Sequence, residues 1–149
     1  MTLFDQISLD IQKAMKAKDK VRLETLRNIK KEFLEAKTAP GSDGTLSDDK
    51  GLKIIQKLVK QGKDDAQLFK DNNRQSLADE SIAQIKVMEE YLPKQMSEKD
   101  IEVKVKEIIA DLGASSMQDM GKVMKEANKE MAGRAEGRII SGIVRKLLA

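Results

Sequence analysis

The chain has 149 residues, of which 40% are hydrophobic, 36% are charged and 3% are aromatic, and its formal net charge is +3. It contains no histidine and no cysteine, which excludes Ser-His-Asp triads, thiol nucleophiles, disulfides and Cys/His zinc sites. This composition, rich in Lys, Glu, Ala, Leu and Ile, is typical of an all-helical protein with one domain or two small ones.

The chain carries no sign of a membrane span or of export. No stretch approaches 18 apolar residues, and the first residues include acids where a signal peptide has a basic start. We therefore expect a cytoplasmic protein with no membrane partner.

Four helices are expected in the first part of the chain. Thr2 and Asp5 have the spacing of a capping box, and apolar residues then recur at helical spacing. The pattern restarts at Asp19, and residues 37–45 form a Pro- and Gly-containing loop. The expected helices are 3–18, 19–36, 47–71 and a fourth that carries Leu92 and ends before Pro93.

Three shorter helices are expected after Pro93. Ser97 with Asp100 and Ser116 with Asp119 each have capping-box spacing, Gly113 is a stop signal, and Gly133 is an interruption. The last helix starts at about residue 135. The expected inward stripes are Ile101, Val105, Ile108 and Leu112, then Met117, Met120, Met124, Ala127 and Met131, then Ile139, Ile140, Ile143, Val144, Leu147 and Leu148.

No segment shows sustained alternation of polar and apolar residues, so we expect no sheet. The predicted fold class is all-α, with a four-helix N-terminal domain at 1–94 and a small three-helix domain at 95–149. The methionines from 117 to 131 have two interpretations, an adaptable binding groove or, more simply, core filling.

The first basic feature lies on the third expected helix. Residues 50–63 contain five lysines and no acid, and at about 100° per residue four of them share one face. This row faces phosphates in one interpretation and is simply the solvated back of an amphipathic helix in the other. Its members are Lys50, Lys53, Lys57 and Lys60.

The second basic feature is the C-terminal third of the chain. Residues 121–149 hold seven basic and three acidic residues, a local net charge of +4. A row of the three lysines is expected on the sixth helix and a row of the three arginines on one face of the last helix, and arginine suits bidentate phosphate contacts. Equally, Glu126 has the spacing to form surface ion pairs with two of the lysines. The candidate residues are Lys122, Lys125, Lys129, Arg134, Arg138 and Arg145.

Nothing in the sequence specifies a catalytic site, a metal site or a cofactor. No two carboxylates stand in a recognisable acid–base pair. Gly121-Lys122 is followed by Val123 and so is no phosphate-binding loop. The hydroxyls of Ser115 and Ser116 are explained by helix capping.

Several segments resemble the GatB/YqeY family, most closely its free-standing YqeY-like proteins. They are Tyr-Leu-Pro-Lys-Gln-Met-Ser at 91–97, Leu-Gly-Ala-Ser-Ser-Met-Gln-Asp-Met-Gly-Lys-Val-Met at 112–124, Gly-Arg-Ala-Glu-Gly-Arg at 133–138, and an N-terminal signature at 57–69. The part from about Met96 is also similar to the tail domain of GatB, a component of aminoacyl-tRNA amidotransferase. Gly62 departs from the basic residue that the family pattern suggests, and close packing beside Ile55 and Val59 is sufficient reason for it.

The resemblance implies an accessory protein that binds tRNA, with Lys122, Lys125 and Arg134 on the matching tail motif. It also carries a family label of carbon–nitrogen ligase activity with glutamine as amido donor, although the catalytic modules of the large enzyme have no counterpart here. With no Trp and one Tyr, binding would rest on shape and phosphate contacts, and no DNA specificity is expected. The alternatives are a module that docks on an amidotransferase or other protein, and, third, catalysis of amide transfer by the chain itself.

Overall fold

The computed structural model describes all 149 residues and is built of seven α-helices and one short 3-10 turn, without strands. The predicted all-α fold class is therefore confirmed. The chain divides into two compact units, residues Met1–Leu92 and Pro93–Ala149, each with its own hydrophobic core. No helix is both long enough and apolar enough to cross a bilayer.

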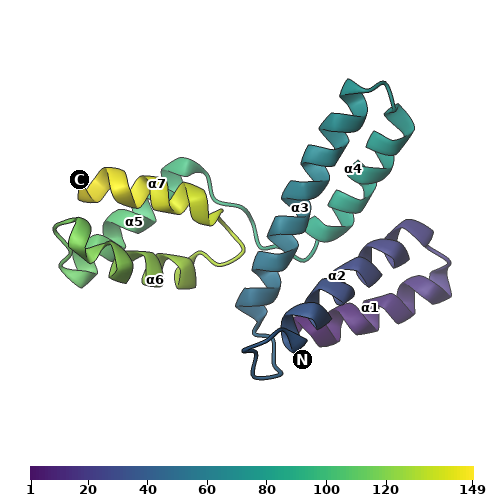
Figure 1. Cartoon of the computed structure of the whole chain (residues 1–149), viewed down its shortest axis with the longest axis horizontal. Helices are drawn as coiled ribbons and strands as arrows, with labels where there is room; N and C mark the ends of the chain where they lie inside the picture. The colour runs from purple at the N-terminus through teal and green to yellow at the C-terminus, as the bar shows by residue number, and fades with distance from the viewer. The chain divides into compact units, whose positions relative to one another are not determined.

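The N-terminal unit consists of two antiparallel helical hairpins (Figure 1). Helix α1 (Leu3–Ala17) pairs with α2 (Lys20–Thr38), and α3 (Asp48–Asp71) pairs with α4 (Gln75–Glu89). Helix α2 also packs on α3 and α4, so it joins the two hairpins. The fully buried side chains at this junction include Ile7, Leu26, Ile29, Phe33 and Ile55.

The capping box predicted at Thr2 is present, since the Thr2 hydroxyl accepts from the amide of Asp5 and the Asp5 carboxylate accepts in return. Asp48, at the start of α3, adds a hydrogen bond to the same end of α1 by accepting from the amide of Leu3 at 2.9 Å. The start of α1 is thereby tied to the start of α3.

Gly62 of α3 lies close against Ile85 of α4. A Cβ atom at this position would lie 2.9 Å from Cγ1 of Ile85 on α4, which is closer than carbon atoms pack. The prediction that close packing accounts for this mid-helix glycine is confirmed.

The end of α4 is held against the first hairpin by polar contacts. The Tyr91 hydroxyl donates to the Asp10 carboxylate at 2.6 Å, and Arg22 pairs with Glu90 at 2.8 Å. The prediction that this helix continues to Leu92 is wrong, because α4 ends at Glu89 and the chain turns so that Tyr91 reaches α1.

The C-terminal unit contains α5 (Glu98–Leu112), the 3-10 turn η1 (Met117–Asp119), α6 (Met120–Glu130) and α7 (Gly137–Leu148). The three helices pack on one another around a single cluster of apolar side chains. Its buried members include Ile101, Val105, Ile108, Val123, Ala127, Met131, Ile140, Val144 and Leu148.

The ends of α5 follow the sequence signals. Ser97 and Asp100 form the predicted capping box, and Gly113 ends the helix in the left-handed conformation with φ of 63°. Leu112, expected in the inward stripe, is instead 45% exposed beside this stop.

The start of α6 differs from the prediction. Asp119 accepts from the amide of Ser115 rather than Ser116, and Ser116 caps the 3-10 turn instead of an α-helix. Met117 lies in that turn and is 45% exposed, so its predicted burial is wrong because the 3.6-residue period does not hold there. The inward stripe runs through Val123, which is fully buried, rather than through Met117.

Candidate nucleic-acid interface

The α6 lysine row, defined as Lys122, Lys125 and Lys129, is a continuous basic surface of the C-terminal unit. All three side chains are exposed and share one face, because they are three and four residues apart. The opposite face of α6 is anchored in the core by Val123, Ala127 and Met131. Packing of that stripe therefore turns the row outward.

The acids of α6 do not neutralise this row. The ion pairs that Glu126 has the spacing to form with Lys122 and Lys129 are absent, and no carboxylate lies within 4 Å of any amine of the row. Glu130 is used elsewhere, since it pairs with Lys104 of α5 at 3.3 Å. Three exposed ammonium groups are thus left for an external anion.

Two of the three candidate arginines lie on α7, and the third lies in the connection before it. Arg138 and Arg145 are exposed on α7 and share one face, two helical turns apart. Arg134 was expected on the same helix, but α7 begins at Gly137, so Arg134 lies in the connection that precedes it.

Arg134 has a structural role in that connection. Its Nε donates to the carbonyl of Lys94 at 3.3 Å, and its own carbonyl accepts from the amide of Met96 at 2.9 Å. Nearby, the side-chain amide of Gln95 donates to the carbonyl of Gly133, whose φ of 73° is a conformation that glycine adopts readily. Two of the segments noted in the sequence, 91–97 and 133–138, are therefore hydrogen-bonded to each other.

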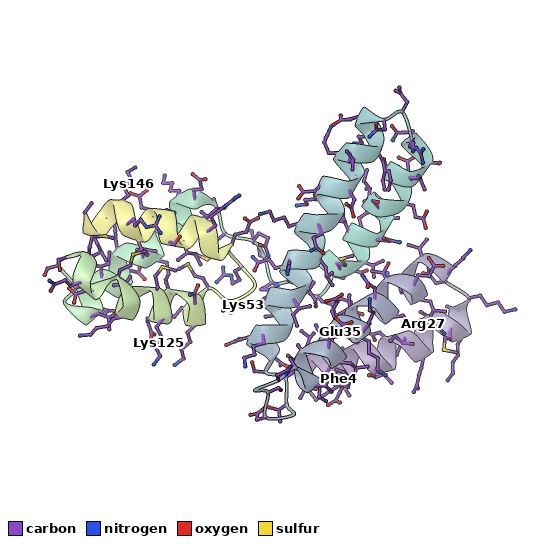
Figure 2. All side chains as sticks on the ribbon, viewed as in Figure 1. Phe4, Arg27, Glu35, Lys53, Lys125 and Lys146 are labelled. Carbon is purple, nitrogen blue, oxygen red and sulfur yellow. The ribbon has the colours of Figure 1, made fainter.

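The basic side chains of α6 and α7 do not all point the same way. Figure 2 shows Lys125 of α6 and Lys146 of α7 extending from opposite sides of the C-terminal unit. The α6 lysine row consequently forms one surface, and Lys146 of α7 lies on another.

The α3 lysine row, defined as Lys50, Lys53, Lys57 and Lys60, belongs to the N-terminal unit. All four side chains are exposed, and none forms an ion pair. Figure 2 shows Lys53 on the side of α3 that faces away from α4. No carboxylate of a neighbouring helix lies within 4 Å of an amine of the row.

A further basic face on α2 was missed in the sequence analysis. Arg27, Lys30 and Lys31 border a shallow hollow of about 340 Å³ around Leu34, which is 43% exposed, and Glu35 adds one carboxylate to the same lining. The ammonium groups of Lys30 and Lys37 lie 5.7 and 4.2 Å from the centre of the Phe4 ring. In the sequence, this face is indicated by three basic residues between positions 27 and 31.

The polar groups near the α6 row are occupied in local structure. The hydrogen bond from the amide of Ser115, with smaller contributions from the nearby Ser116 amide and the charge of Lys122, lowers the pKa of Asp119 below its usual value, so that carboxyl is ionised at neutral pH. No group of three or more acidic side chains is arranged to hold a metal ion. This surface offers charge and hydrogen-bond donors for binding.

Comparison with protein-family models gives a match over residues 4–148 to the family described as Yqey-like protein. The chain belongs to the YqeY-like protein family. The resemblance noted in the sequence is thereby confirmed for the free-standing YqeY-like group, over nearly the whole chain.

Curated relatives include fungal proteins named altered inheritance of mitochondria protein 41, mitochondrial. The protein from Vanderwaltozyma polyspora is 31% identical over 121 residues, which cover 74% of this chain and 63% of the relative. Its counterpart from Kluyveromyces lactis is 31% identical, covering 71% and 58%. The Pyrenophora tritici-repentis protein is 29% identical, covering 93% and 69%. The chain spans about three fifths of the two yeast relatives, and the mitochondrial location is stated in the names of these fungal proteins.

Proposed function

We propose that this YqeY-like protein is a cytoplasmic tRNA-binding accessory of glutamine-dependent aminoacyl-tRNA amidation. The proposal assigns RNA phosphate binding to the α6 lysine row, supported on α7 by Arg138 and Arg145. One observation carries it: three exposed lysines stand on one face of α6 with no acid in ion-pair distance. Similarity to the tail domain of the amidotransferase component GatB is what suggests tRNA as the nucleic acid.

Binding in this proposal rests on charge and shape. The chain has no Trp, and its one Tyr donates to Asp10 within the N-terminal unit, so bases have few rings to stack on. Phosphate contacts release counterions, and the affinity should therefore fall by about 0.7–0.9 log units per contact for each tenfold rise in salt.

The proposal assigns amide transfer to a partner enzyme. The hydroxyl of Ser116 accepts from the amide of Gln118, the carboxylate of Asp119 accepts from Ser115, and Arg134 donates to a backbone carbonyl. Each of these groups serves the local fold. Glutamine hydrolysis by the purified chain that is lost on substitution of a named acid or lysine would contradict this part.

Titration of the purified protein with bulk tRNA at two salt concentrations tests the proposal. Lys125→Glu should weaken binding about fivefold or more and reduce the salt dependence, because one phosphate contact becomes a repulsion. The matched control is Lys99→Glu on α5, an exposed lysine outside the row with no ion pair, which should change binding less than twofold. Binding that ignores salt, or equal losses in both variants, would overturn the proposal.

A further inference from the structure

An apolar hollow lies beside the N-terminal half of α3, within the N-terminal unit. It has a volume of about 430 Å³ and is formed where the loop between α2 and α3 folds along both helices. Its apolar lining includes Ala39, Pro40, Leu46 and Ile54. A hollow of this size and lining has room for one bulky apolar side chain.

The α3 lysine row begins at this hollow. Lys50 and Lys53 line its rim, and Lys57 and Lys60 continue the row along the same face of α3. An apolar pocket is thus joined to a line of four positive charges on one rigid helix.

Two carboxylates near the start of the row accept hydrogen bonds from other groups. Asp43 accepts from both the amide and the hydroxyl of Thr45, at 3.0 and 2.6 Å. Asp48 accepts from the amide of Leu3. Neither forms an ion pair with Lys50 or Lys53, and although the charge of Lys50 helps to lower the pKa of Asp43, the lysine side chains remain exposed and can attract an external acid.

The length of the row decides the size of the occupant. At 1.5 Å per residue, Lys50 and Lys60 are about 15 Å apart along the helix axis, which is beyond the reach of a metabolite-sized anion. An occupant that spans the whole row carries several negative charges in a line, and one apolar group at its end would fill the hollow.

The lining of the hollow favours a protein over a nucleic acid. Apart from two hydroxyl side chains and the two lysines of its rim, the hollow is bordered by aliphatic side chains, and it contains no aromatic ring on which a base would stack. A leucine or similar side chain fills such a site directly. On a partner helix, acids spaced three and four residues apart then match Lys53, Lys57 and Lys60.

We propose that this surface docks an acidic amphipathic helix of a partner protein, with an apolar residue in the hollow and its carboxylates along the α3 lysine row. The four unpaired lysines favour a partner with several carboxylates. The hollow at the start of the row favours an apolar side chain on that partner. This docking surface is independent of RNA binding by the C-terminal unit.

A designed peptide tests the proposal on the full chain. The probe is a fluorescein-labelled 18-residue helical peptide (a length of about five turns) with one leucine followed by glutamates three, seven and ten positions later. In a fluorescence-anisotropy titration, Lys53→Glu should weaken binding about fivefold to tenfold, since an attraction becomes a repulsion. Ala39→Phe, which fills the hollow from an exposed position, should weaken it by a similar factor.

The matched control is Lys63→Glu, which makes the same charge change on α3 outside the row and should alter peptide binding less than twofold. Far-ultraviolet circular dichroism checks that each variant is folded. A peptide with serine in place of the leucine should bind about tenfold more weakly, because the apolar anchor is lost. Absence of peptide binding, or equal losses in Lys53→Glu and Lys63→Glu, would overturn the proposal.

Two further measurements separate this surface from the tRNA proposal. Peptide binding should be unchanged in Lys125→Glu, whose effect on tRNA tests the C-terminal unit alone. If a single-stranded oligouridylate binds the chain, is weakened by Lys53→Glu and displaces the peptide, the α3 lysine row is a nucleic-acid surface and the docking proposal is wrong.

Discussion

At the scale of single residues, Tyr91 shows how one side chain ties the segment after α4 to α1. Burial, followed by the hydrogen bond to Asp10, raises the pKa of its phenol well above the ordinary value of 10.0. The phenol is therefore protonated, and able to donate, throughout the physiological range. Gln6 donates to the other oxygen of Asp10, so both carboxylate oxygens are used.

Because Tyr91 is the only tyrosine and the chain has no Trp, its ionisation is directly visible in the near-ultraviolet absorbance. A pKa raised on folding stabilises the protein fully below the unfolded value, and this contribution is lost as the pH rises through the folded value. We expect the phenol to titrate above pH 10 in the native protein and near 10 in urea. Asp10→Asn should lower the native pKa part of the way, and an unchanged titration curve would show that the hydrogen bond is not formed in solution.

At the scale of the elements, Gly62 is a position where helix propensity and packing between helices have opposite effects. Alanine is a better helix former than glycine by about 1 kcal/mol. Its Cβ atom would nevertheless lie 2.9 Å from Ile85 Cγ1, an atom near the backbone of α4 that has little freedom to move. Gly142, in α7, has no neighbouring atom within 4 Å of that position.

We therefore expect opposite effects from the same substitution at these two glycines. Gly62→Ala should lower the free energy of unfolding by about 1 kcal/mol, since overpacking costs more than the helix propensity gains. Gly142→Ala should raise it by about 0.5–1 kcal/mol. Urea denaturation followed by circular dichroism measures both, and stabilisation by Gly62→Ala would mean that α3 and α4 pack less closely than 2.9 Å implies.

At the scale of the whole molecule, the chain contains two hydrophobic cores that share no residue. The cluster of the N-terminal unit includes Ile55, and that of the C-terminal unit includes Ile140. Stability is expected to be local to each unit, because removing a core side chain disrupts the contacts of one cluster only.

Amide hydrogen exchange in the full chain tests this independence. Ile140→Ala should destabilise the C-terminal unit by about 2–5 kcal/mol, and amides of α5, α6 and α7 should lose protection while those of α1 to α4 keep it. Ile55→Ala should give the reciprocal pattern. A uniform loss of protection along the chain in either variant would show that the two units unfold together.

Much of the fold could be predicted from the sequence, wherever residues close together in the chain determine the local structure. The capping boxes at Thr2 and Ser97, the stop at Gly113 and the position of Gly62 on the apolar side of its helix all depend on residues within one or two turns. The predictions failed where a 3-10 turn replaced the first turn of a helix at Met117. They also failed where the chain left the helical path early to bring Tyr91 to Asp10, since neither event has a local signal.

The sequence by itself determined that this protein is helical, that it lacks the residues for thiol, triad or Cys/His zinc chemistry, and which lysines share a helix face. Periodicity and residue type decide these properties, and both are local. Only the tertiary structure decided that Glu130 forms an ion pair with Lys104 and that Arg134 donates to the carbonyl of Lys94. It also decided that an apolar hollow adjoins Lys50 and Lys53. Each depends on which helices and loops meet in space, because ion pairing and burial are set by neighbours that are distant along the chain.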